Sequence, residues 1–215
     1  MKYRNVIFDL DSTLSSIEGI DELGKLRKMG DRIKSLTQKA MSGRLPFGRV
    51  FIRRLNLIRP TRGELAAIAK IYINSITPGA PELIAWLKTR GANIFVVTAG
   101  YTDCSYPLTD YLEIPRENVF ANRLIFDASG RFQQVDKTIP LWRDGGKRQI
   151  VSKIMVSHPG KTLCVGDGIS DWDAAQIADG FIYFGGVVWR PSVAAKADIV
   201  IKERNLFGLR SYLSC

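Results

Sequence analysis

The sequence has few of the residues that build disulfide frameworks, zinc sites or membrane helices. Its 215 residues include one histidine and three cysteines, and no two cysteines have CxxC spacing. This pattern argues against a disulfide scaffold or a zinc ribbon. No apolar run reaches the ~18 residues that a membrane helix requires, and Asp9 and Asp11 interrupt the apolar start that a secretory signal peptide would need. We therefore expect a soluble, cytoplasmic protein with no membrane partner.

Acidic residues are outnumbered by basic ones, and the formal net charge is +10. Such a charge attracts phosphates and other anions, and also attracts nucleic acid without specificity. The Lys and Arg residues are scattered in ones and twos, and no nucleic-acid-binding motif accompanies them. We predict no specific nucleic-acid partner, although a basic nucleic-acid-binding domain stays open as the non-enzyme alternative.

Short apolar runs that end in polar or glycine residues occur at 5–11, 93–100, 162–168 and 181–186. They are continuous rather than alternating, which is typical of strands buried on both faces of a parallel sheet. Helical patterns follow several of these runs, at 81–91, 147–158 and 170–180. This alternation predicts an α/β fold with a doubly wound parallel sheet.

Residues 14–75 contain helical patterns but no buried strand pattern. The last of these helical patterns begins with Thr61 and Glu64 in capping-box spacing. We predict that residues 14–75 form a helical cap, and that residues 1–13 and 76–215 form the α/β core. The segment 122–136 is typical of a β-hairpin that turns at Ser129-Gly130.

Two carboxylates follow the first strand, at Asp9 and Asp11. Ligands bind at the carboxyl ends of the strands in an open parallel sheet, and two adjacent acids repel each other unless a cation compensates them. Oxygen ligands of this kind suit Mg²⁺. Asp9 can then act as a nucleophile and Asp11 as a general acid and base. The alternative is a strand end that carries two solvated acids.

A second acidic cluster, Gly166–Asp171, follows the third predicted strand. Asp167 can complete a metal site, with Asp171 as an outer or additional ligand. Ser170 suits the cap of the helix that follows. The alternative is a glycine-rich turn with an ordinary helix cap.

Thr98 ends the second predicted strand, and Lys147 begins a helix. The Thr98 hydroxyl and the backbone amides of Ala99 and Gly100 can hold phosphate oxygens. A lysine is unfavourable at the positive end of a helix dipole unless it faces an anion. The alternatives are an ordinary strand threonine and a solvated lysine.

These elements, in this order, resemble the signatures of the haloacid dehalogenase superfamily of phosphohydrolases. The matching residues are Asp9-Leu10-Asp11-Ser12-Thr13, Thr98, Lys147 and Gly166–Asp171. The resemblance implies a Rossmann-like core with a small inserted cap, and Mg²⁺-dependent hydrolysis of a phosphate monoester through an aspartyl-phosphate. It implies metal ligands at Asp9, Asp167 and the backbone carbonyl of Asp11, with Asp171 and Ser170 behind them.

Within this superfamily the chain resembles the phosphoserine phosphatases. The supporting segments cover most of the chain, at 11–24, 39–47, 53–60, 76–84, 118–124, 145–147 and 184–186. The resemblance implies hydrolysis of O-phospho-L-serine to L-serine and phosphate by a monomer or homodimer. It places Glu18 at the substrate ammonium and Arg54 at its carboxylate.

The same resemblance places Met41 and Phe47 on the cap side of the pocket, and Ser12 and Thr13 near the phosphate. The chain has Thr98-Ala99-Gly100 where these phosphatases typically have Ser-Gly-Gly. Another small phosphorylated metabolite as substrate, or phosphate transfer to an alcohol, therefore stays open. From the residues alone, Glu18 can equally stabilise its helix and Arg54 can lie on a solvated face.

Overall fold

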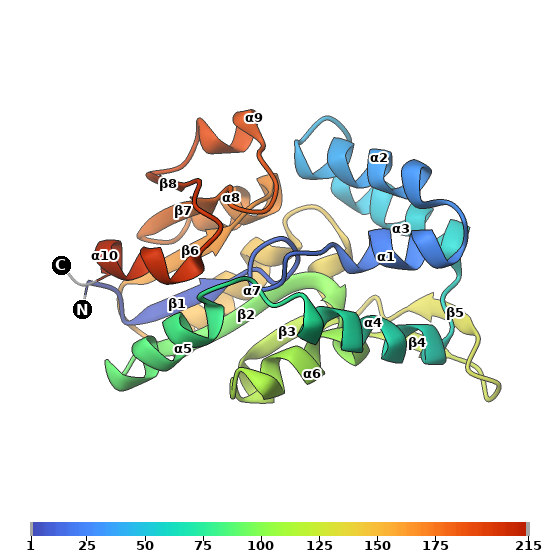
Figure 1. Cartoon of the computed structure of the whole chain (residues 1–215), viewed down its shortest axis with the longest axis horizontal. Helices are drawn as coiled ribbons and strands as arrows, with labels where there is room; N and C mark the ends of the chain where they lie inside the picture. Colours follow the sequence, from blue (N-terminus) through green and yellow to red (C-terminus); the bar gives the residue numbers. More distant parts are fainter. Residues whose placement is uncertain (1, 214–215) are drawn as a thin grey trace.

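A six-stranded parallel sheet forms the centre of the protein (Figure 1), in a computed structural model that describes residues 2–213. Its strands are β1 (Asn5–Phe8), β2 (Asn93–Tyr101), β3 (Val119–Asn122), β6 (Thr162–Gly166), β7 (Gly180–Phe184) and β8 (Ile199–Ile201). Their order is β3-β2-β1-β6-β7-β8. The chain therefore builds outward from β1 in one direction and from β6 in the other, and the switch point lies between these two strands.

Helices cover both faces of the sheet, which confirms the predicted doubly wound α/β fold. Val6 and Phe8 of β1 pack into one apolar cluster and Ile7 into another, because successive strand residues point to opposite faces. The helices that pack on the first face include α5 (Ala80–Thr89) and α6 (Thr102–Tyr111), and those on the second include α7 (Gly146–Ser157) and α8 (Ile169–Ala175). Burial on both sides explains why these strands have continuous apolar sequences.

The helical segment, residues 14–75, contains α1 (Gly19–Leu26), α2 (Gly30–Met41), α3 (Phe47–Ile58) and α4 (Arg62–Asn74). In Figure 1, α1, α2 and α3 gather beyond the carboxyl end of the sheet, whereas α4 lies beside α6. The capping box at the start of α4 is confirmed, since the Glu64 amide donates to Thr61 Oγ1 at 3.2 Å and the Thr61 amide donates to Glu64 Oε2 at 2.7 Å. The division into a core and a cap stays a prediction.

The smaller elements complete the chain. The predicted hairpin is confirmed as β4 (Leu124–Phe126) and β5 (Phe132–Val135), which pair antiparallel. The remaining helical turns are η1 (Arg116–Asn118), η2 (Pro140–Trp142), α9 (Pro191–Ala194), η3 (Leu206–Leu209) and α10 (Arg210–Leu213). Two predictions for the helix expected over 170–180 are wrong. The helix ends at Ala175, and residues 176–179 form a turn before β7 begins at Gly180. Its N-cap is Gly168, so Ser170 lies within the helix and does not cap it.

The cysteines and the helix lengths agree with the sequence patterns. Cys104 and Cys164 are buried free thiols, and Cys215 lies outside the described residues. Between residues 2 and 213, every helix is too short or too polar to cross a lipid bilayer.

Candidate active site

The turn after β1 brings the helical segment back over the end of the sheet. Ser12 is fully buried and has a left-handed backbone, with φ of 54°. Such a conformation is costly for a residue with a side chain, and it persists where the surrounding contacts fix it. Here the Ser12 amide donates to the Ile17 carbonyl at 3.0 Å, and the Ser12 hydroxyl donates to Glu18 Oε1 at 3.0 Å. The turn therefore places Glu18 close to the carboxyl end of β1.

Asp9 and Lys147 form a buried ion pair at the switch point of the sheet. Lys147 Nζ lies 2.8 Å from Asp9 Oδ1 and 2.6 Å from Asp171 Oδ1, and these three side chains are at most 6% exposed. Burial alone lowers the pKa of Lys147, but the charges of Asp171 and Asp9 outweigh it and raise that pKa above its usual value. Lys147 is therefore a fixed cation beside Asp9.

Three buried carboxylates, Asp9, Asp167 and Asp171, offer oxygen atoms within 4.8 Å of one another. Burial, followed by the charge of Asp171, raises the pKa of Asp9 well above its usual value. Burial also raises the pKa of Asp167 to about 6. Within residues 2–213, Asp167 Oδ1 has no hydrogen-bond partner. An oxygen donor set with excess negative charge and an unpaired buried oxygen fits a hard divalent cation such as Mg²⁺.

The Asp11 carboxylate lies apart from this cluster. Its Oδ1 accepts hydrogen bonds from the Gly19 amide at 2.7 Å and from the Tyr72 hydroxyl, and its Oδ2 accepts one from the Thr98 hydroxyl at 3.3 Å. Burial raises its pKa, although these hydrogen bonds act in the opposite direction. A carboxyl group with a raised pKa can carry a proton to a leaving group near neutral pH.

Contacts from the helical segment hold the Asp11 carboxylate in place. Gly19 begins α1 and Tyr72 lies on α4, and a Cβ atom at Gly19 would overlap the Tyr72 hydroxyl. The glycine thus lets two hydrogen-bond donors converge on one carboxylate oxygen. Tyr72 lies outside the sequence motifs, so the sequence did not indicate its contact with Asp11.

The residues expected around a phosphate lie close to Asp11. Thr98 is fully buried, and its Oγ1 accepts a hydrogen bond from the Gly100 amide at 2.9 Å. The carbonyl of Ala99 accepts one from the Asn122 side chain at 2.9 Å, which fixes the end of β2. The buried hydroxyl groups of Thr13 and Ser170 have no hydrogen-bond partner in the described part of the chain. Of the two residues, Ser170 borders a cavity, so its hydroxyl can donate to an anion there, whereas Thr13 is fully buried.

A narrow inner cavity joins residues from the sheet and from the helical segment. Its lining combines candidate catalytic groups with apolar and charged side chains from α1, α2 and α3: Asp9, Asp11, Glu18, Ile20, Met41, Phe47, Phe51, Arg54, Tyr72, Ala99, Gly100, Tyr101, Lys147 and Ser170. Ser12, Thr13, Thr98, Asp167 and Asp171 are not part of this lining. A wider cavity shares Phe47, Ala99, Lys147 and Ser170 with it and extends outward past Arg44 and Arg143.

The N-terminus of α3 is held by the loop that precedes α7, the helix that carries Lys147. Asp144 accepts hydrogen bonds from the amides of Phe47 at 2.8 Å and Gly48 at 3.0 Å. A Cβ atom at Gly48 would lie 3.1 Å from the Cα atom of Arg143, so the missing side chain permits this close approach. Because α3 carries Phe47 and Arg54 into the inner cavity, Asp144 links this side of the cavity to the start of α7, where Lys147 lies.

Glu18 and Arg190 face each other at the edge of the carboxylate cluster. Arg190 is 6% exposed, bonds to the Asp167 carboxylate, and has its Nη2 atom 3.4 Å from Glu18 Oε1. Burial, and then the charge of Asp11, raise the pKa of Glu18 well above its usual value. Arg190 precedes α9 in a loop without a motif, so no sequence pattern indicated that it lies at the site.

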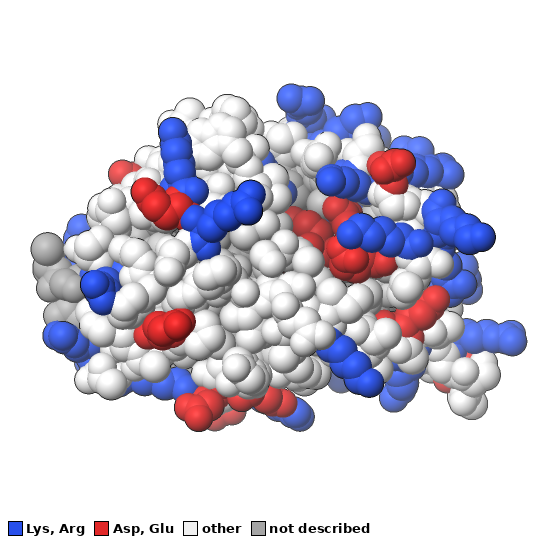
Figure 2. All heavy atoms as spheres, in the orientation of Figure 1, with Lys and Arg blue, Asp and Glu red and all other residues white. Residues whose placement is uncertain are grey.

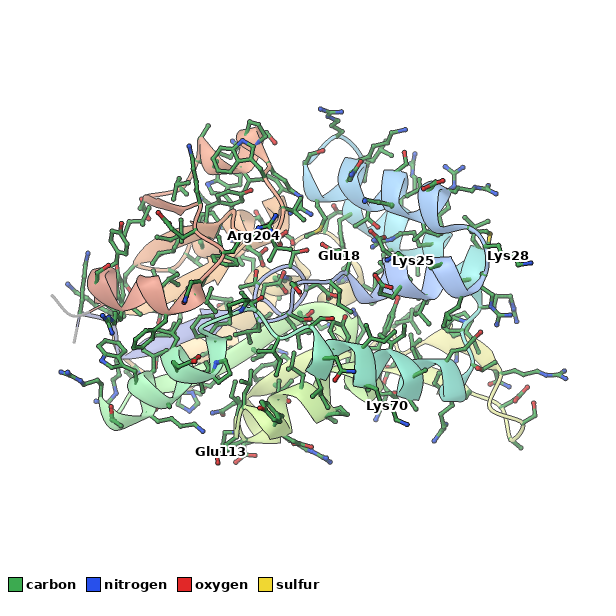
Figure 3. The ribbon with its side chains drawn as sticks, in the orientation of Figure 1. Glu18, Lys25, Lys28, Lys70, Glu113 and Arg204 are labelled. Atoms are coloured by element: carbon green, nitrogen blue, oxygen red, sulfur yellow. The ribbon has the colours of Figure 1, made fainter. Side chains whose placement is uncertain are left out.

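Charged side chains surround this site on the face of the molecule that Figure 2 shows. Figure 2 shows acidic atoms in the hollow between the helical segment and the sheet, with Lys and Arg side chains around it. Figure 3 shows Glu18 in this central region, whereas Lys25 and Lys28 point outward from the helical segment. The basic rim attracts an anionic ligand toward the hollow.

A family model for haloacid dehalogenase-like hydrolases matches residues 3–179. The chain belongs to this family. It is 37% identical over 199 residues to the phosphoserine phosphatase of Homo sapiens, covering 92% of this chain and 88% of that protein. It is 31% identical over 217 residues to the phosphoserine phosphatase of Methanocaldococcus jannaschii, covering 99% and 98% respectively.

The fold agrees with these sequence relationships. The solved structure of a phospho-aspartyl intermediate analogue of phosphoserine phosphatase matches the chain with a TM-score of 0.88 and 29% identity, covering 99% of each chain. The resemblance to this superfamily is therefore confirmed. The buried carboxylates, Lys147 and the inner cavity belong to an enzyme of the phosphoric monoester hydrolase class.

Proposed function

We propose that this enzyme hydrolyses O-phospho-L-serine to L-serine and phosphate through an aspartyl-phosphate on Asp9. The observation that carries the proposal is the inner cavity, in which Asp9 and Lys147 lie with Asp11, Glu18 and Arg54. The nucleophile Asp9 and the proton donor Asp11 match the phosphate ester of this substrate. The anionic Glu18 matches its ammonium group, and the cationic Arg54 matches its carboxylate. The names of the relatives support the same substrate.

The first step forms the covalent intermediate. A carboxylate oxygen of Asp9 attacks phosphorus while the bond from phosphorus to the serine oxygen breaks. Asp11 donates its proton to that oxygen, so L-serine leaves as a neutral alcohol. The raised pKa of Asp11 favours the protonated form that this step needs. Lys147 and Thr98 offset the charge that develops on the phosphoryl oxygens.

The second step restores the enzyme. Asp11 takes a proton from water, the water oxygen bonds to phosphorus, and the bond from phosphorus to Asp9 breaks. Phosphate leaves, and Asp9 is again a carboxylate paired with Lys147. In the proposed metal site, Asp9, Asp167 and the Asp11 carbonyl would hold Mg²⁺, with Asp171 and Ser170 in its outer shell. When bound, Mg²⁺ supplies positive charge to the phosphoryl group.

Recognition of the amino acid falls to the helical segment. Arg54 binds the substrate carboxylate through parallel hydrogen bonds, and Glu18 binds the ammonium group. Met41 and Phe47 enclose the carbon chain, while Ser12 and Thr13 lie near the phosphate. Burial of Arg54 with an unpaired Nε supports this assignment. Cytoplasmic location and a monomeric or dimeric state stay predictions of the sequence.

A substrate panel with and without Mg²⁺ tests the proposal. We expect phosphate release to be fastest from O-phospho-L-serine, because phosphoethanolamine lacks the carboxylate and 3-phosphoglycerate lacks the ammonium group. A chelator should abolish release, and Mg²⁺ should restore it. Faster hydrolysis of another ester, or transfer of the phosphoryl group to an added alcohol, would assign a different substrate or reaction. Full activity in the chelator would exclude the metal site.

A further inference from the structure

Arg54 is connected to an acidic residue through a threonine. Its Nη1 donates to Thr37 Oγ1 at 2.8 Å, and the Thr37 hydroxyl lies 2.5 Å from Asp21 Oδ1, to which it donates. Arg54 lies on α3, Thr37 on α2 and Asp21 on α1. Thr37 is 1% exposed and Arg54 is 5% exposed. The hydrogen-bond network Asp21–Thr37–Arg54 therefore spans three helices, and its Thr37 and Arg54 side chains are shielded from water.

This arrangement leaves Arg54 without a direct counter-ion. Within the described part of the chain, no carboxylate oxygen forms an ion pair with its guanidinium. Its Nε is buried and has no hydrogen-bond partner there. A buried cation is costly unless an anion compensates it. The nearby acid, Asp21, contacts it through the Thr37 hydroxyl and not directly, so the guanidinium keeps an edge that can pair with an anionic ligand.

The geometry of the guanidinium explains why an intervening hydroxyl is useful. The group is planar and presents its donors as forks that match a carboxylate. Thr37 engages Nη1 alone, which leaves the opposite fork of Nε and Nη2 for a ligand. A carboxylate in direct contact with Arg54 would instead occupy one fork and neutralise the charge. Thr37 thus fixes the plane of the guanidinium and leaves its Nε–Nη2 edge available for a ligand.

We propose that Thr37 and Asp21 are positioning residues that set the enzyme's preference for substrates with a carboxylate. The inference rests on the proposed function, because it assigns Arg54 to the carboxylate of O-phospho-L-serine. Neither residue contacts the reacting phosphorus in this scheme. Their effect is confined to the affinity for the amino-acid part of the substrate.

A purely structural role for Thr37 makes a different prediction. Its hydroxyl also lies 3.1 Å from the Ile33 carbonyl, a contact that many helix threonines make. If this contact is its only role, a change at Thr37 affects all substrates alike. The two roles are therefore separated by comparing substrates with and without a carboxylate.

The test uses Thr37→Val, which keeps the side-chain volume and removes the hydroxyl. Thr37→Ser keeps the hydroxyl and serves as the rescue. The matched control is Thr109→Val, because Thr109 is also a buried helix threonine whose hydroxyl contacts the carbonyl four residues earlier. Steady-state kinetics are measured with O-phospho-L-serine and with p-nitrophenyl phosphate, which lacks a carboxylate.

We expect Thr37→Val to raise KM for O-phospho-L-serine by about tenfold with little change in kcat, the scale of one hydrogen bond to a charged group. The kinetics with p-nitrophenyl phosphate should be unchanged, and Thr37→Ser should restore the wild-type KM. Thr109→Val should leave both substrates unaffected. Asp21→Asn should act in the same direction as Thr37→Val, because it weakens the acceptor of the Thr37 hydroxyl.

Two results would overturn the inference while leaving the proposed function intact. One is an unchanged KM for O-phospho-L-serine in Thr37→Val. The other is an equal loss for both substrates, which indicates a structural role. By contrast, a wild-type enzyme that releases no phosphate from O-phospho-L-serine would overturn the proposed function and the inference together.

Discussion

The Asp9→Asn variant is expected to lose phosphate release by about 10⁴-fold or more, the scale for removal of a covalent nucleophile. An amide has almost the shape of the carboxylate, but it is a poor nucleophile and carries no charge to pair with Lys147. The fold should persist, because Lys147 keeps its contact with Asp171 at 2.6 Å. The measurement is steady-state phosphate release from O-phospho-L-serine, with circular dichroism as the check of folding.

Asp136→Asn is the matched control for this experiment. Asp136 is also a buried aspartate, 7% exposed, but it follows the β4–β5 hairpin and lines neither cavity of the site. Its variant should keep wild-type turnover. Substantial steady-state activity in a folded Asp9→Asn enzyme would remove Asp9 from the role of nucleophile.

The Lys147→Met variant is expected to lose both activity and stability. Without the ammonium group, Asp9 and Asp171 are buried carboxylates that lack their counter-charge, and the pKa of Asp9 rises further. Removal of one donor to developing charge lowers kcat by about 10²–10³-fold. Removal of one partner of a buried ion pair lowers the free energy of unfolding by about 3–5 kcal/mol. Kinetics and denaturant unfolding measure the two effects.

The pH dependence of activity shows whether Lys147→Met loses activity through the raised pKa of Asp9 or simply through unfolding. Because the loss of Lys147 raises the pKa of Asp9, the carboxylate form of Asp9 becomes more populated as pH increases. The activity of Lys147→Met relative to wild type should therefore rise with pH. Lys70→Met is the control, since Lys70 is exposed on α4 and should tolerate the change (Figure 3). Wild-type activity and stability in Lys147→Met would contradict the role given to the buried pair.

The sequence was sufficient to predict the parts of the fold that are buried on both faces. β1, β2, β6 and β7 have continuous apolar runs because each strand packs against helices on two sides. β3 and β8 were missed because they lie at the two edges of the sheet and are not completely buried, as the central strands β1 and β6 are. The end of α8 was placed too late, since nothing local marks the change from helix to the turn before Gly180.

The sequence predicted the site residues that directly follow buried strands. Asp9, Asp11 and Asp167 follow buried strands, and the structure brings them with Lys147 to one edge of the sheet. Tyr72 and Arg190 were missed because their partners lie 61 and 23 residues away along the chain. Thr37 has the sequence context of an ordinary helix residue, and only the packing of three helices places it between Asp21 and Arg54.

Chemical trapping of the intermediate on Asp9 is the most direct test of the mechanism. The enzyme is mixed with O-phospho-L-serine and Mg²⁺ and treated with borohydride, which reduces an acyl phosphate to an alcohol and so converts the modified aspartate to homoserine. Peptide mass spectrometry should then find homoserine at position 9 alone, and only when substrate is present. Reduction at another aspartate, or no reduction during rapid turnover, would contradict an aspartyl-phosphate on Asp9.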